Sequence, residues 1–384
     1  MASYQSAQVQ VPAGMIDFGV GQPGLSLLPL AVMRQAAAHR LGQPDPTLLQ
    51  YGAEQGDGRF RLALAEFLSE GYGIAVEAEQ LLITNGVSQG LDWVCHRFTR
   101  PGDTIFVEEP TYHLVLPIFL DRGLKVVAVP TDENGLIVEA LEEKLAEQRP
   151  AFLYTIPVFH NPSTVTLAAD RRRRLAALSR RHGFLIAADE VYQLLNYAAT
   201  PPPPLISYDE AGQVLSLGSF SKILGPGLRL GWIQAAPGLI ERLVDSGLLH
   251  SGGGFDPFTS GLVHSAIELG LQQSYLAHLK SVYSQRVRVL SDALRRHLPP
   301  SVTFHEPQGG FFIWLRLPPD VDAGGLLAEA RRQGVGFQPG ARFSVNGGLR
   351  NYLRLSFAYY DAPELQEGAR RLAQVIRREI GGAL

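Results

Sequence analysis

The sequence predicts an α/β protein with a mostly parallel sheet covered by helices, joined to a smaller α+β unit. From residue 81 onward, short apolar runs alternate with helical patterns, which is typical of a parallel sheet with helices on both faces. After residue 299 the pattern changes to strand, helix, strand and a final helix, as in a separate α+β unit. Forty glycines and 26 prolines among 384 residues supply the turns that frequent alternation requires.

The large sheet is predicted to have seven strands, and helical patterns lie between several of them. The strands are residues 81–84, 104–108, 125–129, 152–156, 184–189, 214–218 and 229–235. The helices are residues 29–41, 60–70, 88–98, 112–121, 138–147, 170–182, 237–249 and 256–269. A periodic stretch at 274–298 is long enough for a helix that connects two domains.

The smaller unit is predicted from strands at 310–317 and 352–357 and helices at 323–333 and 363–380. We therefore expect three parts. Residues 1–45 form an N-terminal arm and first helix associated with the small domain. Residues 46–285 form the large domain, and residues 286–384 form the small C-terminal domain.

Composition excludes several classes of function. The net charge of −3 gives no basic surface for nucleic acid. No apolar run reaches the roughly 18 residues of a membrane span, and no signal segment opens the chain. The single cysteine, Cys95, excludes an intrachain disulfide. We expect a cytoplasmic protein with no nucleic-acid or membrane partner and no metal site. The arginines of residues 171–174 are predicted to lie on a solvated helix face.

Lys222 lies in a segment whose residue types suit a covalent bond to a phosphorylated ligand. Residues 216–232 read SLGSFSKILGPGLRLGW, which places Lys222 in a turn after a strand, where open α/β sheets bind ligands. The hydroxyls of Ser219 and Ser221 and the guanidinium of Arg229 suit a phosphate, and the amine suits a carbonyl. A lone lysine is usually an exposed loop residue, but apolar neighbours on both sides indicate a buried loop, where an unpaired lysine is costly.

The pattern SxSKxxGPGLRxGW resembles the lysine signature of the class I/II aminotransferases, enzymes of fold type I that depend on pyridoxal 5′-phosphate. The resemblance implies that Lys222 carries the cofactor as a Schiff base. It also implies that Ser219, Ser221 and Arg229 contact the cofactor phosphate. The similarity runs in consistent order from about residue 16 to 380 and is nearest in style to the branch of 2-aminoadipate and aromatic aminotransferases.

Two further motifs contain candidate partners of the cofactor ring. Residues 184–192 read FLIAADEVY, and a carboxylate that ends a buried strand is costly unless it is paired. The resemblance assigns Asp189 to the pyridine nitrogen, where it keeps the ring an electron acceptor, and Tyr192 to the phenolic oxygen. Residues 157–162 read PVFHNP, and Asn161 matches a residue that contacts that oxygen and the substrate. A turn asparagine before proline is the ordinary alternative.

The phosphate and the ring face have candidates near the start of the large domain. Residues 84–91 read TNGVSQGL, a strand followed by a glycine turn and a helix, whose N-terminus favours anions. The resemblance places the phosphate at Gly86, Val87 and Ser88. Residues 109–112 read EPTY, and Tyr112 matches an aromatic residue that stacks on the ring. A core tyrosine is the alternative.

The substrate carboxylate has candidates in the arm and in the small domain. Residues 352–357 read YLRLSF, and an arginine on an apolar strand needs an anionic partner. The resemblance assigns Arg354 to the α-carboxylate and the backbone of Gly21 to the same group. Tyr51, in LQYG, matches a tyrosine that reaches the phosphate across a dimer interface. We therefore expect a homodimer whose active sites are completed across that interface.

The resemblance implies an aminotransferase that moves an amino group from an L-amino acid to a 2-oxo acid, with 2-oxoglutarate as the expected acceptor, by a ping-pong mechanism. Lys222 would act as the general base. A lyase that cleaves C–S bonds or eliminates at the β- or γ-carbon would use the same cofactor residues. A non-catalytic sensor domain, of the kind that follows a DNA-binding module in some bacterial regulators, is the remote alternative. Only about fifteen residues precede the arm, which we expect to be too few for such a module. The residues that select the substrate side chain stay open.

Overall fold

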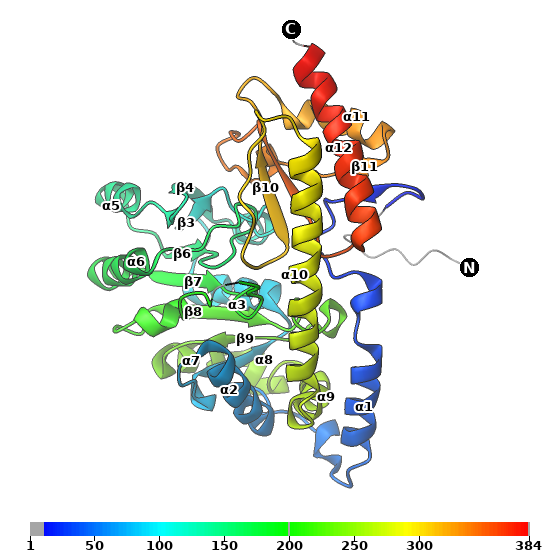
Figure 1. Ribbon diagram of the computed structural model, residues 1–384. Coiled ribbons are helices and arrows are strands. Elements are labelled where there is room, and N and C mark those ends of the chain that lie inside the picture. The colour runs from blue at the N-terminus through cyan, green and yellow to red at the C-terminus, as the bar shows by residue number, and fades with distance from the viewer. Residues whose placement is uncertain (1–10, 199, 383–384) are drawn as a thin grey trace.

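The computed structural model describes residues 11–198 and 200–382, and its centre is an eight-stranded sheet (Figure 1). The strands, in spatial order, are β2 (Leu81–Thr84), β9 (Gly231–Gln234), β8 (Val214–Ser219), β7 (Leu185–Asp189), β6 (Phe152–Thr155), β3 (Thr104–Glu109), β4 (Lys125–Asp132) and β5 (Gly135–Leu136). The five strands from β8 to β4 run parallel to one another. β9 is antiparallel to β2 and β8, and β5 is antiparallel to β4. The predicted mostly parallel sheet is confirmed.

The prediction of seven strands was wrong by one strand, β5. After β4 the chain reverses so that Thr131 pairs with Leu136 and Asp132 pairs with Gly135. Gly135 has a φ of +93°, which a glycine adopts at no steric cost. The dipeptide Asn134–Gly135 is a hairpin signal, but a strand of two residues is too short to show an apolar pattern.

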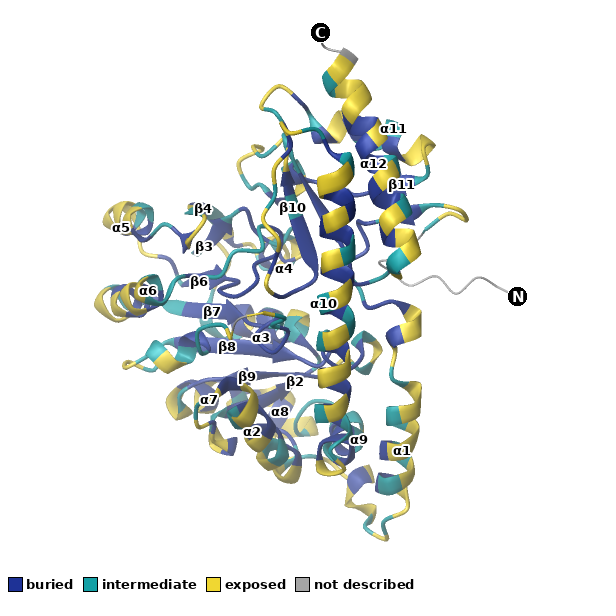
Figure 2. Cartoon of the chain, in the orientation of Figure 1, coloured by how far each residue is buried: buried dark blue, intermediate teal, exposed yellow. Residues whose placement is uncertain are grey.

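Helices cover both faces of the large sheet. On one face α3 (Val87–Phe98), α4 (Leu116–Asp121) and α7 (Pro237–Val244) pack against strand residues such as Ile105 and Val107. On the other face α5 (Val138–Glu147) and α6 (Ala169–His182) pack against residues such as Phe106. Successive residues of β3 thus serve opposite cores, as the alternation of a strand requires. The central strands are buried, β4 near the sheet edge is partly exposed, and the outer sides of α5 and α6 are exposed (Figure 2).

Two helix predictions differ from the structure, one by an internal break and one by its first residue. The single helix expected at 237–249 is two helices, α7 and α8 (Gly247–Gly252). The break falls at Ser246, whose side chain accepts a hydrogen bond from the backbone N–H of Leu249 and caps α8. The helix expected at 112–121 begins only at Leu116, so that Tyr112 lies in a loop after β3.

The predicted solvated face of α6 was wrong at Arg172, which is fully buried. Its guanidinium donates to the carbonyl oxygens of Leu167 at 2.9 Å and Pro157 at 2.6 Å. It also lies 3.9 Å from the buried carboxylate of Glu190. A buried arginine is tolerated only where such partners compensate its desolvation, and these partners are not visible in the arginine-rich pattern itself.

The smaller unit contains two small sheets. β13 (Tyr352–Ser356) lies between β10 (Phe312–Arg316) and β12 (Gln338–Pro339), antiparallel to both. β1 (Ile16–Asp17) pairs in parallel with β11 (Val335–Gly336), so the N-terminal arm joins this unit. α11 (Ala323–Arg332) and α12 (Ala362–Gly382) complete it.

The long helix α10 (Leu271–His297) lies along both units (Figure 1). It packs against α9 (Pro257–Glu268) at one end and α12 at the other, and α1 (Leu30–Leu41) packs against α9. α2 (Gly58–Tyr72) also contacts α9. The domain boundaries at 45/46 and 285/286 remain predictions, and residues 1–10 lie outside the described residues. None of the helices in the described part combines the length and apolar character of a membrane span.

Candidate active site

The predicted site residues follow the carboxyl ends of four neighbouring parallel strands. Tyr112 follows β3, Asn161 follows β6, Asp189 ends β7, and Lys222 lies three residues after β8. The carboxyl ends of parallel strands meet at one edge of the sheet, where ligands of open α/β sheets bind. The fold therefore brings residues that are 110 positions apart in the sequence to one edge.

The amine of Lys222 lies between the arm and the sheet. Its Nζ donates a hydrogen bond to the carbonyl oxygen of Gly21 at 3.0 Å and lies 5.3 Å from the centre of the Phe311 ring. Burial, together with the charge of Arg354, lowers the pKa of Lys222 to about 8, although Asp189 acts in the opposite direction. A lysine in this environment supplies an unprotonated amine at lower pH than a solvated lysine does.

The carboxylate of Asp189 receives one side-chain hydrogen bond among the described residues. Its Oδ2 accepts a hydrogen bond from the hydroxyl of Tyr154 at 2.8 Å. Its Oδ1 is buried and has no hydrogen-bond partner among the described residues. Burial raises the pKa of Asp189 to about 6, and the hydrogen bond from Tyr154 opposes this rise. A buried acceptor without a donor is costly, so Oδ1 is positioned to accept a hydrogen bond from a ligand.

Arg354, on β13 of the smaller unit, reaches the edge of the large sheet. Its guanidinium donates to Oδ1 of Asn161 at 2.7 Å and to the carbonyl oxygen of Gly19 at 3.1 Å. It lies 4.0 Å from the centre of the Phe312 ring and 4.9 Å from that of Phe343. Burial lowers the pKa of Arg354 to about 10, so the side chain stays cationic at neutral pH. A buried cation whose hydrogen bonds go to neutral oxygens suits a carboxylate ligand.

Hydroxyls, a guanidinium and a helix N-terminus gather at the end of the sheet. Strand pairing places Gly231 next to both Thr84 and Ser219. The hydroxyl of Ser219 donates to that of Ser221 at 2.9 Å. Gly86 directly precedes α3, where unpaired backbone N–H groups and the helix dipole attract anions.

Arg229 lies beside this helix N-terminus. Its φ is +50°, and its Nη2 donates to the carbonyl oxygen of Asn85 at 3.3 Å. A Cβ added to Gly86 would lie 2.8 Å from that Nη2. The backbone of Val87 and Ser88 forms the first turn of α3, and the side chain of Ser88 is exposed. These groups form a site that suits a phosphate.

The remaining predicted residues are three tyrosines, of which Tyr192 is buried and Tyr51 is exposed. Tyr192 is buried, and its ring lies 6.1 Å from that of Phe312. Burial raises the pKa of both Tyr112 and Tyr192, and the charge of Arg354 opposes this in each case. Tyr51 is 80% exposed and is not brought to the site within one chain.

Several contributors were not predicted from the sequence, among them Tyr154, the carbonyl oxygen of Gly19 and the rings of Phe311, Phe312 and Phe343. Tyr154 lies in the fully buried strand FLYT, where a tyrosine hydroxyl needs a partner, and this was the available signal. Gly19 and Arg354 are 335 positions apart, and no local pattern connects them.

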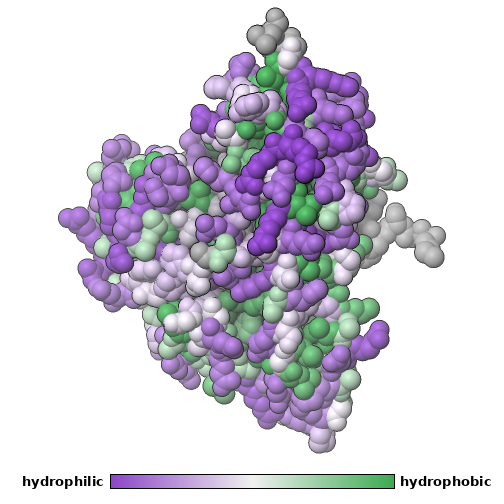
Figure 3. Space-filling view, in the orientation of Figure 1, coloured by the Kyte–Doolittle hydropathy of each residue, from purple (hydrophilic) through white to green (hydrophobic). Residues whose placement is uncertain are grey.

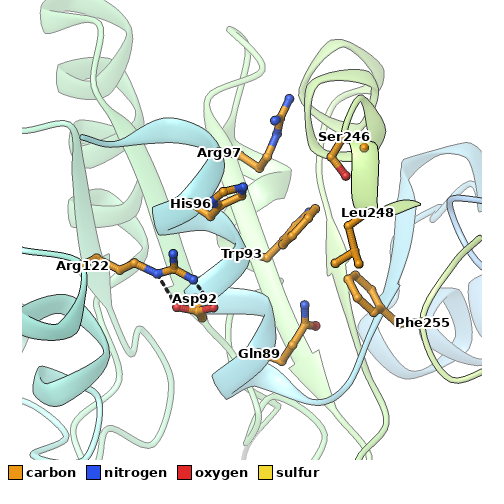
Figure 4. A pocket seen from close by; sticks show the side chains of 10 residues that line it. Gln89, Asp92, Trp93, His96, Arg97, Arg122, Ser246, Leu248 and Phe255 are labelled. Carbon is orange, nitrogen blue, oxygen red and sulfur yellow. Dashed lines mark hydrogen bonds and ion pairs between the residues drawn. The ribbon is translucent and has the colours of Figure 1, made fainter. Parts of the chain in front are cut away.

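A pocket of about 520 Å³ lies at the surface beside α3 and α8 (Figure 4). Trp93 on α3 and Phe255 and Leu248 near α8 form its apolar wall, and Asp92 and Arg122 form an ion pair at its rim with a separation of 2.5 Å. None of the predicted site residues lines it. The pocket is therefore separate from the edge at which Lys222 and Asp189 meet.

The described residues fit pyridoxal phosphate. The amine of Lys222 could bond to an aldehyde, Oδ1 of Asp189 could accept from a ring N–H, and the groups around Gly86 and Arg229 could hold the phosphate. The fold and this set of groups suit an α/β enzyme with a phosphorylated cofactor that reacts with a lysine amine.

Comparisons with known proteins specify the family. The sequence matches the aminotransferases of class I and II over residues 13–372. It is 34% identical over 377 residues to aromatic-amino-acid aminotransferase 1 of Thermococcus litoralis, covering 95% of this chain and 89% of that protein. It is 30% identical to an uncharacterized HTH-type transcriptional regulator of Bacillus subtilis, covering 94% of this chain and 74% of the regulator.

A solved structure shares the fold closely. The structure of LysN, the α-aminoadipate aminotransferase of Thermus thermophilus, complexed with N-(5′-phosphopyridoxyl)-L-leucine, superposes with a TM-score of 0.85 at 32% identity, covering 96% of this chain and 94% of that chain. The chain thus belongs to the class I and II aminotransferases. It is a pyridoxal-phosphate-dependent transaminase.

Proposed function

We propose that this transaminase takes its amino group from an L-amino acid with an aromatic or large apolar side chain and gives it to 2-oxoglutarate, at the edge where Lys222, Asp189 and Arg354 meet. The observation that carries the proposal is the set of uncompensated buried groups there. Lys222 has a lowered pKa, Oδ1 of Asp189 is free, and Arg354 has neutral partners. Each of these groups gains a complementary partner from cofactor and substrate.

Each residue has a proposed role. Pyridoxal phosphate, when bound, supplies an electron sink for the carbanion of the substrate. Lys222 holds the cofactor and then moves the proton at the substrate α-carbon, for which a pKa near neutral is suited. Asp189 keeps a proton on the ring nitrogen through Oδ1. Arg354 holds the α-carboxylate with its planar guanidinium, and Asn161 orients that guanidinium by accepting its Nη1–H.

Three groups are proposed to fix the cofactor from other directions. Tyr112 stacks on the ring and Tyr192 donates to the phenolic oxygen. Ser219, Ser221, Arg229 and the backbone of Gly86, Val87 and Ser88 hold the phosphate. The backbone of Gly21 borders the substrate carboxylate, because a Cβ there would lie 3.6 Å from Nη2 of Arg354.

The proposed preference for aromatic or apolar side chains rests on the walls around Arg354. Phe312 and Phe343 flank the guanidinium, and the ring of His113 lies 4.7 Å from that of Phe343. Such walls favour apolar groups. The name of the aromatic-amino-acid relative from Thermococcus litoralis supports the same choice.

We further propose a cytoplasmic homodimer in which Tyr51 reaches the phosphate of the partner site. Exposed large apolar side chains concentrate in one stretch of the chain: Leu25, Leu28, Leu30, Leu41, Leu49 and Tyr51. Figure 3 shows apolar atoms gathered on the lower part of this face, where α1 and α9 lie. Exposed apolar side chains gathered in this way support burial against a second copy.

The test is the conversion of a panel of amino acids by the purified holoprotein with 2-oxoglutarate, followed by product analysis. Glutamate should form fastest with aromatic or large apolar donors. Lys222→Ala should abolish conversion and covalent retention of the cofactor after reduction, whereas Lys125→Ala, an exposed lysine, should do neither. Release of ammonia or thiol without glutamate would favour a lyase. Cofactor binding without conversion of any donor would favour the non-catalytic alternative, and an HTH-type transcriptional regulator of Bacillus subtilis is among the similar proteins.

A further inference from the structure

Tyr154 donates a hydrogen bond to the carboxylate of Asp189, the residue whose other oxygen has no partner among the described residues. Tyr154 lies on β6, next to β7, and the hydroxyl crosses to Oδ2 of Asp189 at 2.8 Å. We propose that Tyr154 is a positioning residue that fixes Asp189 as an oriented anion facing the cofactor ring. This inference deepens the proposed function and rests on it.

The ring of Tyr154 is immobilised. The residue is fully buried, and its neighbours across the sheet place it between β3 and β7. The Phe119 ring packs edge-on against it at 5.6 Å and 67°. A buried tyrosine hydroxyl requires a partner, and here the partner is one carboxylate oxygen. The hydroxyl is therefore a donor whose direction is set by the core.

The hydrogen bond from Tyr154 to Oδ2 has two consequences for Asp189. It occupies Oδ2, so that Oδ1 is the oxygen left to face a ligand. It also favours the ionised carboxyl, because a hydrogen bond to the charged form offsets part of the desolvation. Ionisation matters because a protonated carboxyl cannot hold a proton on the ring nitrogen by charge.

Other groups act on Asp189, but they differ from Tyr154 in kind. The backbone N–H of Val191 and the charges of Lys222 and His160 favour the ionised form of Asp189. The charge of Asp189 in turn raises the pKa of the neighbouring Glu190, whose pKa is raised mainly by burial. Lys222 is the group proposed to bond to the cofactor, so its charge is not constant. His160 acts at a distance and is paired 3.2 Å from Glu108. Tyr154 is the side chain that contacts Asp189 directly without taking part in the chemistry.

The test is Tyr154→Phe, which keeps the ring and its packing. Two quantities are measured without any amino acid: the dissociation constant of pyridoxal phosphate from the apo-protein, and the pH at which the bound cofactor changes colour. We expect about ten-fold weaker binding, which corresponds to about 1.4 kcal/mol. We also expect the colour change at higher pH. The colour changes when the nitrogen that would join Lys222 to the cofactor loses its proton, and a less positive ring nitrogen repels that proton less.

Asp189→Asn completes a double-mutant cycle. If Tyr154 acts through Asp189, adding Tyr154→Phe to Asp189→Asn should change neither quantity further. An equal loss in the Asn background, or wild-type values for both quantities in Tyr154→Phe, would overturn the inference. Tyr275→Phe is the matched control, because it removes a buried hydroxyl that donates to the Leu27 carbonyl instead, and it should keep the colour change.

A second measurement covers the case in which Tyr154→Phe does not fold. Site-specific 3-fluorotyrosine at position 154 keeps the hydroxyl and makes it a stronger donor, so the colour change should move to lower pH; no movement would contradict the inference. Failure of wild-type protein to bind pyridoxal phosphate would instead refute the proposed function itself. The two failures are therefore distinguishable.

Discussion

Replacing Asp189 with asparagine should stabilise the apo-protein while it weakens cofactor binding. In the folded protein burial raises the pKa of this carboxyl to about 6, against 3.8 when solvated. Above pH 7 the folded apo-protein keeps the ionised form at a cost of about 3 kcal/mol, since each pH unit between the two values corresponds to 1.36 kcal/mol. Oδ1 has no hydrogen-bond partner among the described residues, so we assign the buried amide that replaces it a cost of about 1 kcal/mol. The expected net gain is about 2 kcal/mol.

The pH dependence follows from the direction of the pKa shift. The cost is absent below pH 3.8, where the carboxyl is protonated in both folded and unfolded states, grows as pH rises toward 6, and is complete above it. The melting temperature of apo Asp189→Asn should therefore exceed that of the wild type by about 2–3 °C at pH 7.5. The difference in melting temperature should change sign near pH 4, because there the destabilisation by the buried amide exceeds the small remaining cost of the ionised carboxyl.

The assay is calorimetry of both apo-proteins from pH 4 to 8, with Asp121→Asn, an exposed carboxyl, as the control that should show a flat difference. A constant difference between wild type and Asp189→Asn across this range would refute the reasoning. So would a less stable variant at pH 7.5.

Three other predictions concern neighbouring groups. Gly86→Ala should weaken pyridoxal phosphate binding at least ten-fold, because φ there is +81° and the added Cβ meets Arg229. Gly73→Ala, with φ +69° and open space, should lower the melting temperature but leave cofactor affinity unchanged. Arg354→Lys should raise KM for amino donors about 100-fold, because lysine cannot make the bidentate hydrogen bond to the carboxylate, a loss of roughly 3 kcal/mol. The affinity for the cofactor should stay within about two-fold of the wild-type value. Acetylation of Lys222 in the apo-protein, followed by mass spectrometry, should show a midpoint near pH 8, and a midpoint above 10 would contradict the lowered pKa.

Much of the fold could be predicted because strands buried on both faces read as apolar runs. The runs beginning at Leu81, Thr104 and Val214 match observed strands to within a residue at each end. Strands of two residues, such as β1, β5 and β11, could not be predicted because they carry no periodicity. The buried state of Arg172 depends on carbonyl oxygens of a loop that no local pattern places beneath α6.

The site could be predicted where a residue lies in a motif and not where it acts only through a contact in space. Lys222, Asp189 and Asn161 stand in recognisable segments, and the sheet edge brings them together. Tyr154 has no motif of its own, and its importance appears only when β6 and β7 are adjacent. Tyr51 is the reverse case, since its proposed role needs a second chain.

The charges at the site explain why its groups are arranged at a cost to stability. Lys222, Arg354 and Arg229 are cationic, whereas Asp189 is the carboxylate beside them. Burial disfavours the charged form of the first two and of Asp189, so each raises the free energy of the folded apo-protein. A phosphate and a substrate carboxylate supply the missing negative charge, and a protonated ring nitrogen pairs with Asp189. Binding therefore recovers free energy that folding alone leaves unbalanced, and the holoprotein should gain stability as the logarithm of free cofactor concentration.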